Sequence, residues 1–305
     1  MYFLTEEERQ KLVRGLLPKS RELEISDDLR GWNWNRPPLE AIYDESLAVY
    51  EIAGKYCKTA RDLYLRKVVG VKTKWNQAML RGSVLHETLA ELLIKAKKLI
   101  YLNGVADYQK VIKQLKQREY QALEKREKQM DEKFYSCLKK ELEIMWDFVY
   151  NQLVFRMQDL LAKQPYIGVD SLVNLAIPII VEQKLDGSFL GLSKYLSADA
   201  FNFTEPMILD MKFGRKKEFH KLTVTAYAMV MESIFSFPIS TGCIIYPKFK
   251  DDKLIVEKEF MIINDELRQW FIEERDEKMR LVAEEIDPGV GDDCYKSCPY
   301  HDECY

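Results

Sequence analysis

Two aspartates and a lysine, close together in the sequence, form a pattern that fits metal-assisted hydrolysis. Asp210 and Lys212 fall on one face of an expected strand, because strand side chains alternate between the two faces. If the preceding turn is centred on Thr204 and Glu205, Asp199 lies opposite Asp210 in an antiparallel hairpin. The Cβ atoms of opposed residues lie about 4.5–5.5 Å apart, and two carboxylates in such positions repel unless a cation lies between them. A hard divalent ion such as Mg²⁺ prefers these oxygen ligands.

A neighbouring lysine and an inward histidine would complete such a site. Lys212 could orient or help to deprotonate an attacking water while the ion stabilises charge on a phosphate, which describes phosphodiester hydrolysis. His86 shares a helical stripe with Leu89 and Leu93, so its side chain is expected to face inward. Two alternatives stay open. The hairpin could be exposed with solvated side chains, and His86 could be a core histidine with satisfied hydrogen bonds.

The elements that must position these residues follow from length, composition and periodicity. The chain has 305 residues, 47% of them apolar and 31% charged, which excludes a disordered or fibrous protein and indicates one large or two modest globular bodies. We expect an α/β chain with a helical front half. Strand-like runs are expected at 172–184, 189–203, 206–213, 242–249 and 253–263.

Helices are expected before, between and after these strands. Residues 1–45 are expected to be irregular, and Ser83 is expected to cap a helix that carries His86. Residues 108–162 are expected to form a helical hairpin or arch, or else a solvated surface pair. Further helices are expected at 219–235 and 264–285. The expected division is an extension at 1–50, a helical region at 51–165, a strand-bearing core at 166–285 and a cysteine tail at 286–305.

The charge of the chain is unevenly distributed. The net charge is −3, but residues 55–81 and 212–221 carry excess positive charge. Such an uneven distribution of charge would suit a polyanion, for example a nucleic acid, that binds to one face of the protein. The rings of Tyr56, Tyr64 and Trp75 could then stack on its bases. A solvated basic helix face is the alternative. The basic residues of the first segment are Lys55, Lys58, Arg61, Arg66, Lys67, Lys72, Lys74 and Arg81.

Four of the six cysteines are spaced as ligands of a metal or cluster. Cys294, Cys298 and Cys304 lie in the carboxyl-terminal tail, and Cys57 heads the first basic segment. Four thiolates can hold zinc or a cubane iron–sulfur cluster, and the spacing does not choose between them. Scattered surface thiols are the alternative, and the other two cysteines, Cys137 and Cys243, are interpreted as core residues. The acidic first residues and the short apolar stretches favour a cytoplasmic protein without a membrane segment.

Around the two aspartates, the lysine and the histidine described first, the sequence resembles the RecB-like branch of the PD-(D/E)XK nucleases. The resemblance rests on Arg81-Gly82 before His86, Asp199 after Gly191, Asp210-Met211-Lys212, and a helix that carries Tyr227. It implies a central mixed sheet flanked by helices, and Mg²⁺ or Mn²⁺ held by His86, Asp199, Asp210 and the main-chain carbonyl of Met211. Lys212 would act at the attacking water and Tyr227 near the substrate. The sequence departs from the family at Thr223, where a glutamine is common.

The cysteines are similar to those of the CRISPR-associated iron–sulfur exonucleases of the adaptation module, the Cas four family, in its long archaeal type I-A variety. The likeness covers about residues 50–304. It implies a 4Fe–4S cluster, with zinc as the alternative, on Cys57, Cys294, Cys298 and Cys304. It also implies a metal-dependent exonuclease that trims or selects DNA, single-stranded or with overhangs, for integration into a CRISPR array. Integrase subunits would be its partners, and Arg81, Arg215 and Lys216 would hold phosphates.

Two other functions fit the same residues. The first is a non-catalytic DNA-binding scaffold with a structural cluster, which Thr223 keeps open because the substrate-positioning glutamine is missing. The second is a DNA repair nuclease that works with a helicase. That enzyme would share every motif named above.

Overall fold

A five-stranded mixed sheet forms the centre of the computed structural model, which describes residues 1–73, 75–292 and 294–305. The strands are β1 (Ile179–Leu185), β2 (Leu196–Asn202), β3 (Met207–Met211), β4 (Thr241–Lys250) and β5 (Lys253–Ile262). Their spatial order is their chain order. Only β3 and β4 pair in parallel, and the other neighbours are antiparallel. The expected α/β class with a central mixed sheet is confirmed.

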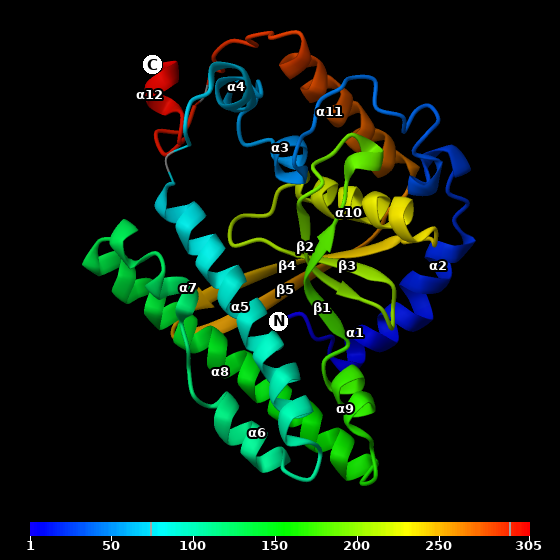
Figure 1. Ribbon diagram of the computed structural model, residues 1–305, viewed down its shortest axis with the longest axis vertical. Coiled ribbons are helices and arrows are strands. Elements are labelled where there is room, and N and C mark those ends of the chain that lie inside the picture. The colour runs from blue at the N-terminus through cyan, green and yellow to red at the C-terminus, as the bar shows by residue number, and fades with distance from the viewer. Residues whose placement is uncertain (74, 293) are drawn as a thin grey trace.

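Helices cover both faces of this sheet (Figure 1). The α-helices are α1 (Glu6–Lys11), α2 (Leu17–Glu22), α3 (Val49–Ala53), α4 (Arg61–Tyr64), α5 (Gln77–Asn103), α6 (Tyr108–Leu115), α7 (Gln121–Glu124), α8 (Glu132–Lys163), α9 (Val169–Ala176), α10 (His220–Phe235), α11 (Asp265–Ala283) and α12 (His301–Cys304). Shorter helical turns are η1 (Leu12–Leu16), η2 (Asp27–Leu29), η3 (Gly31–Asn33), η4 (Leu65–Val69), η5 (Glu127–Gln129) and η6 (Ser188–Leu190). None of the helices in the described parts of the chain combines the length and hydropathy that a bilayer crossing needs.

Two hydrophobic cores, one on each face of the sheet, follow from strand alternation. Leu209 and Met211 of β3 pack on the side of α5 and α8. Ile208, their neighbour in the same strand, packs on the side of α10 and α11. The helix α10 contacts β3, β4 and α11, so most of its sides are buried. A helix that is buried on most sides is apolar on most sides, and the sequence of α10 therefore shows little amphipathic character.

The helical region after α5 forms a layer over the sheet. Residues 108–162 divide into α6, α7 and the long α8, which packs against α5 and β5. The indole of Trp146 in α8 donates a 3.1 Å hydrogen bond to the carbonyl of Leu115. The hairpin expected within 108–162 takes another form, because α6 and α7 are short helices that pack on α5 and α8 is one long helix. The alternative of a solvated surface pair is wrong, because the apolar stripe of α8 is buried.

Three expectations about local structure are wrong. Residues 6–22 are helical, because Thr5 and Glu8 form a capping box. Asn76 caps α5 instead of Ser83, and its side chain accepts a 2.9 Å hydrogen bond from the amide of Met79. Residues 169–176 are helical too. Short apolar runs do not distinguish helix from strand, and Pro178 marks where β1 can begin.

A smaller correction concerns the run at 189–203. Its first part forms the turn η6, and the strand begins only at Leu196. Gly191 after this turn has a φ of 70°, which a residue with a side chain adopts only at a cost. The strand that carries Asp199 is therefore shorter than expected, and it ends in the same hairpin.

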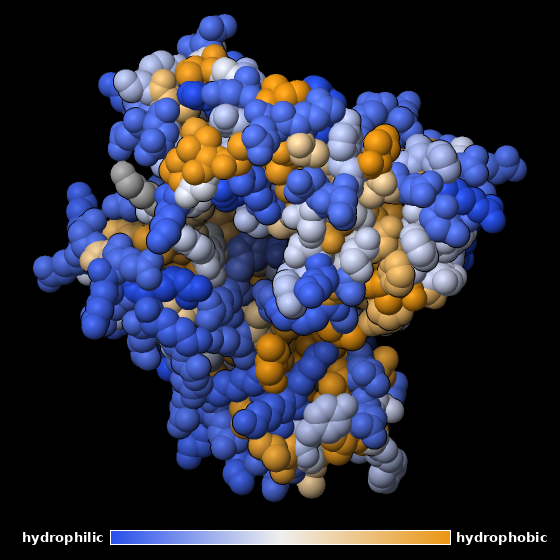
Figure 2. All heavy atoms as spheres, turned by 45° about the horizontal axis from the view of Figure 1, so that its top comes forward, coloured by the Kyte–Doolittle hydropathy of each residue, from blue (hydrophilic) through white to orange (hydrophobic). Residues whose placement is uncertain are grey.

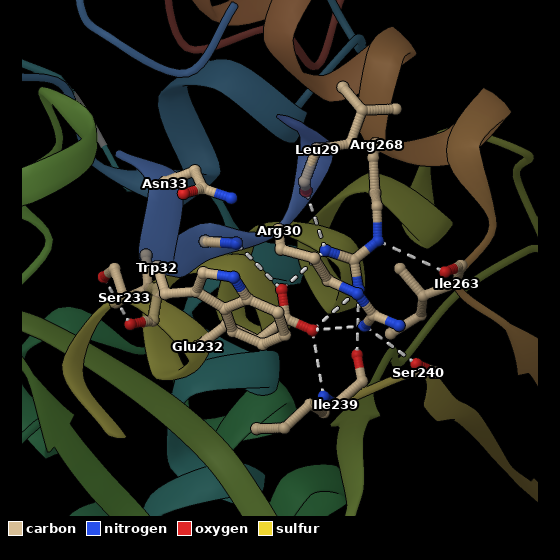
Figure 3. Close-up of polar contacts among 12 residues, drawn as sticks. Leu29, Arg30, Trp32, Asn33, Glu232, Ser233, Ile239, Ser240, Ile263 and Arg268 are labelled. Carbon is tan, nitrogen blue, oxygen red and sulfur yellow. Dashed lines mark hydrogen bonds and ion pairs between the residues drawn. The ribbon is translucent and has the colours of Figure 1, made fainter. Parts of the chain in front are cut away.

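A buried ion-pair network fixes the amino-terminal segment to α10 and α11 (Figure 3). Glu232 accepts hydrogen bonds from both terminal nitrogens of Arg268, at 2.6 and 2.9 Å, and from Arg30 at 2.8 Å. The amide of Gly31 donates to the same carboxylate. A Cβ at Gly31 would lie 2.0 Å from the Met229 carbonyl oxygen, so only glycine fits here. These contacts hold the segment around η3 against α10 and α11.

Candidate active site

The β2–β3 hairpin has the register that the sequence predicts. Ala200 pairs with Leu209 and Asn202 with Met207, so the turn is centred between residues 204 and 205. Continuing this register by one residue places Asp199 opposite Asp210. Strand alternation places Asp210 on the side of α10, because Ile208 belongs to that core. Asp199 instead contacts α5, a helix of the other core, through His86.

Asp199 is held by two groups from other parts of the fold. Its Oδ2 accepts a 2.9 Å hydrogen bond from the main-chain amide of Met211. The Nδ1 atom of His86, on α5, lies 3.3 Å from the same oxygen. The imidazole ring also packs edge-on against Phe213, with the ring centres 5.2 Å apart. The structure therefore brings the predicted histidine and aspartate together from positions more than 100 residues apart.

Asp210 is the most buried acid of the site. Its side chain is 3% exposed, and the Lys212 ammonium lies 3.1 Å from Oδ1 and 3.0 Å from Oδ2. Burial raises the pKa of Asp210 to about 6; Lys212 opposes this rise and the Asp199 charge adds to it. Only Oδ1 meets the Lys212 ammonium with hydrogen-bond geometry. Oδ2 is buried without a hydrogen bond, and the nearby Lys212 ammonium compensates its charge.

Lys212 stays charged in this environment. Burial lowers the pKa of Lys212, but the carboxylates of Asp210 and Asp199 outweigh it, so that the pKa lies above its ordinary value. The main-chain amide of Lys212 donates to the carbonyl of Ile245, which extends the β3–β4 pairing to this residue. The ammonium is thereby fixed at the end of the strand that carries Asp210.

Tyr227 of α10 faces the same region. Burial raises its pKa well above the ordinary value, and the charges of Asp199 and Asp210 raise the pKa further. Met211, predicted to supply a carbonyl ligand, follows Asp210 at the end of β3, and its amide donates a hydrogen bond to Asp199. The role of its carbonyl stays a prediction.

Two residues of this neighbourhood were not expected. Burial and the charges of Asp199 and Asp210 raise the pKa of Tyr2, which lies in the core below the site. Glu182 in β1 has a φ of 51°. It has no paired residue in β2, although its neighbours Val181 and Gln183 both do. A positive φ at a residue with a side chain costs about 1–3 kcal/mol and often marks a functional position. An acid inside an apolar strand was the only sequence signal for Glu182.

The predicted phosphate-binding residues differ in availability. Arg81 makes a bidentate ion pair with Glu141, at 2.6 and 3.0 Å. Lys216 pairs with Glu257 at 2.6 Å. Arg215 is exposed and forms no ion pair with any residue that the structure describes. Two of the three cations are therefore partly neutralised within the protein.

The basic segment 55–81 is compensated in the same way. Lys55 pairs with Glu274, and Arg61 makes a bidentate contact with Asp287. Glu51 contacts two further cations of this segment. Lys74, which was counted in the segment, lies outside the described residues. The excess positive charge seen in the sequence is smaller on the folded surface.

The four candidate cluster cysteines are half-buried and gather at one end of the molecule. Thr59 donates a 2.9 Å hydrogen bond to the carbonyl of Gly289, and Asn76 donates a 3.0 Å bond to that of Ser297. Figure 1 shows the tail and α12 beside α4. Burial raises the pKa of the Cys298 thiol, with contributions from Cys57 and Cys304. The fold thus brings the early cysteine to the late ones.

The two remaining cysteines differ from each other. Cys243 is fully buried, as expected, and burial raises its pKa to about 12. Cys137 on α8 is exposed, so its interpretation as a core residue is wrong; it lies on the polar side of an amphipathic helix.

Neither group of candidate ligands is arranged as a finished coordination shell. Within 1–73, 75–292 and 294–305, no three His, Cys, Asp or Glu side chains converge as ligands of a metal do. The donor types nevertheless suit their ions. Oxygen and imidazole ligands suit a divalent cation, and the buried Asp210 Oδ2 lacks a hydrogen bond; four thiols suit iron or zinc.

The displayed face of the molecule is mostly hydrophilic (Figure 2). Figure 2 shows a hollow with hydrophilic walls near the middle of the displayed face. A separate cavity of about 520 Å³ lies between α8 and the β4–β5 hairpin, lined by Lys140, Asp147 and Asp252 among others. It contains none of the predicted site residues, so it is not the candidate active site.

Comparison with known proteins gives a consistent picture. The chain matches, over residues 1–305, the model of the family described as "CRISPR-associated exonuclease Csa1". A protein of this name from Saccharolobus solfataricus is 31% identical over 297 residues, which cover 95% of this chain and 94% of the relative. Another of this name, from Thermoproteus tenax, is 27% identical over 301 residues, or 99% of each chain. The residues matched by the family model span both the aspartate hairpin and the cysteine tail.

Proposed function

Because the chain belongs to the family of CRISPR-associated exonuclease Csa1, we propose that it is itself a metal-dependent exonuclease that hydrolyses DNA on a PD-(D/E)XK core of the RecB-like type. One observation carries the proposal. Asp199 and Asp210 stand opposite each other across a hairpin, with the Lys212 ammonium 3.0 Å from one and His86 3.3 Å from the other. Such a juxtaposition of like charges is unfavourable without a cation.

Four groups of this chain would hold the ion: the carboxylates of Asp199 and Asp210, the imidazole of His86 and the carbonyl of Met211. Bound Mg²⁺ or Mn²⁺ would supply stabilisation of the charge that builds up on the scissile phosphate. The 2.9 Å hydrogen bond from the Met211 amide fixes the Asp199 carboxylate before any ion arrives. This orientation lowers the reorganisation that binding requires.

The other residues act on water and substrate. Lys212 would hold the attacking water by a hydrogen bond from its ammonium, which Asp210 keeps at the strand end. Tyr227 would contact the substrate from α10. Arg215 would contact a DNA phosphate, since it has no ion-pair partner among the described residues. Arg81 and Lys216 would have to share their charge between DNA and the acids with which they pair.

We also propose that Cys57, Cys294, Cys298 and Cys304 hold a 4Fe–4S cluster, with zinc as the alternative. The proposal is supported by the half-buried thiols and by the polar contacts that dock the tail on the segment after Cys57. Such a centre would tie chain segments separated by more than 230 residues, which lowers the entropy of the unfolded chain. Its role here is to fix the tail beside the sheet.

The biological role proposed is trimming or selection of DNA fragments before their integration into a CRISPR array. The substrate would be DNA that is single-stranded or has overhangs, and the partners would be integrase subunits of the adaptation complex. The relatives named above support the CRISPR context. An exonuclease of this kind would act on the ends of fragments that such partners then join.

A nuclease assay on end-labelled single-stranded DNA with Mn²⁺ or Mg²⁺ tests the proposal. Asp210→Asn should reduce the cleavage rate by at least about 100-fold, and DNA binding in a mobility-shift assay should persist. Asp252→Asn is the matched control, since Asp252 is an exposed acid that pairs with Lys140. Full activity of Asp210→Asn would exclude the site. Binding by the natural chain without cleavage would favour the scaffold function instead.

A further inference from the structure

We propose that Tyr56 is the residue on which a nucleobase of the bound DNA end stacks, and that His220 positions it. The inference rests on the proposed DNA function and adds a substrate contact to it. Tyr56 is 63% exposed, although its hydroxyl group is fixed by the interior of the protein. An aromatic ring that is anchored at one end and open on its face is suited to stacking.

The anchor is a hydrogen-bonded row of three side chains. The Tyr56 hydroxyl lies 3.1 Å from Nε2 of His220, whose Nδ1 lies 3.1 Å from the hydroxyl of Tyr246. His220 and Tyr246 are buried, at 2% and 1% exposure. Burial lowers the pKa of His220 to about 4, so the ring is neutral at pH 7. A neutral imidazole donates one hydrogen bond and accepts one, which satisfies both tyrosines.

Two further contacts restrict the Tyr56 ring. The ring of Phe219 meets it edge-on, with the ring centres 5.0 Å apart and the planes at 85°. The loop that leads to Tyr56 is held by Lys278, whose ammonium donates to the carbonyls of Ile52 and Gly54 at 2.6 and 3.0 Å. The ring is therefore fixed before any ligand binds, which reduces the entropy lost on binding.

The ring also lies on the side of the candidate site. Burial raises the pKa of Tyr56, the Lys212 ammonium lowers it, and the charge of Asp210 raises it, so both charges lie within electrostatic reach of the hydroxyl. The Lys216 ammonium lies 5.3 Å above the ring of Tyr246, the last member of the row. The row thus holds the exposed ring of Tyr56 at one end and contacts the Lys216 ammonium at the other.

This combination favours single-stranded DNA as the ligand. A base in a duplex has both faces covered by its neighbours, whereas a base at a single-stranded end offers a face to an aromatic ring. Stacking is tolerant of sequence because every base has such a face, and loss of one platform weakens binding by about 5- to 150-fold. Cations near the ring would hold the adjoining phosphates.

Binding of short single-stranded DNA that carries 2-aminopurine near one end tests the inference. The measurement is made in an Asp210→Asn background, which prevents cleavage. Tyr56→Leu should weaken binding by about 5- to 150-fold and should abolish the quenching of fluorescence that stacking causes. Tyr56→Trp should restore both, which shows that the ring is required rather than the fold. Tyr166→Leu, the control, removes a fully exposed tyrosine between α8 and α9 and should change neither.

The role of His220 is tested by Tyr56→Phe. This variant keeps the ring and removes the hydroxyl, so cleavage by otherwise unchanged protein should show a higher KM with little change in kcat. Equal quenching and affinity in Tyr56→Leu and Tyr166→Leu would overturn the inference while cleavage by the natural chain still supports the proposed function. Absence of any DNA binding and cleavage would overturn both. Quenching by RNA alone would assign the ring to another ligand.

Discussion

The carboxylate of Asp199 accepts a 2.9 Å hydrogen bond from the main-chain amide of Met211, the residue that follows Asp210. This bond joins β2 and β3 beyond the last paired residues of their ladder. The bond fixes the Asp199 carboxylate relative to Met211 in the opposite strand. Because Met211 follows Asp210 directly, the backbone helps to set the spacing of the two carboxylates. The hydrogen bond therefore orients the Asp199 carboxylate without the help of an ion.

Substitution of Asp199 should separate its structural role from its role as a ligand. Asp199→Asn keeps an oxygen that can accept from the Met211 amide, whereas Asp199→Ala leaves this amide without a partner. Both variants should lose Mn²⁺-dependent cleavage, but only the alanine variant should lose about 1–3 kcal/mol of unfolding free energy. Denaturant unfolding and a nuclease assay measure the two effects. Equal stability of the two variants would contradict the role of this hydrogen bond.

The raised pKa of Asp210 should make the metal-free protein less stable as the pH rises. The carboxyl binds its proton more tightly in the folded state, with a pKa of about 6 against 3.8 unfolded. Its stabilising contribution is complete below the unfolded pKa and is lost as the pH rises through about 6. In EDTA, the unfolding free energy of the natural protein relative to Asp210→Asn should fall by about 1 kcal/mol from pH 5 to pH 7. A difference that does not change with pH would contradict this.

Removal of the Lys212 ammonium should impair both chemistry and metal binding. Lys212→Met takes away the charge that opposes the rise in the pKa of Asp210, so Mn²⁺ should bind more weakly at pH 7. The rate at saturating Mn²⁺ should fall by about 10²- to 10⁴-fold. Lys163→Met, at an exposed pair with Asp159, is the control. Unchanged kcat in Lys212→Met would show that the ammonium does not act on the attacking water.

The cysteine variants should identify the cluster ligands. Protein purified without oxygen should contain iron and sulfide, with broad visible absorption, and Cys57→Ser or Cys298→Ser should lose it. Cys137→Ser should keep it, because Cys137 is an exposed thiol on α8. Stoichiometric zinc in a colourless protein would support the alternative metal. Retention of the full metal content in both ligand variants would reject the four-cysteine site.

The buried pair of Glu232 and Arg268 should be important for stability. Glu232→Gln leaves the guanidinium buried without a negative partner, and should cost about 3–5 kcal/mol of unfolding free energy. Glu218→Gln breaks an exposed pair with Lys221 and should have little effect. Chemical denaturation of the two variants measures the difference. A small loss in Glu232→Gln would show that the backbone groups around it compensate.

Several features could be predicted because they depend on local spacing. The alternation of apolar residues gave the faces of β3, and the number of residues between Asp199 and Asp210 gave the register of the hairpin. The helix expected at 264–285 is likewise present as α11, which Asn264 caps by accepting a hydrogen bond from the amide of Leu267. Local errors occurred where patterns are ambiguous. The apolar run before Pro178 fits both helix and strand, and Asn76 competes with Ser83 as a cap.

Charge was harder to predict than pattern. The sequence showed an excess of cations in residues 55–81 but not which acids would face them after folding. Glu51, Glu274 and Asp287 pair with this segment, and the last two lie more than 200 residues away. The prediction that Cys137 lies in the core failed for a similar reason. A cysteine is found on both buried and exposed helix faces, so its residue type does not tell which face it occupies.

The sequence by itself determined which residues are candidate ligands: two opposed carboxylates with a lysine beside one of them, and an early cysteine together with a late group of three. Only the tertiary structure decided which distant groups complete the site. The contact of His86 with Asp199, the neutral His220 between two tyrosines and the burial of Asp210 join segments far apart in the chain. Neither distance in space nor burial is contained in local periodicity, because both depend on how whole elements pack.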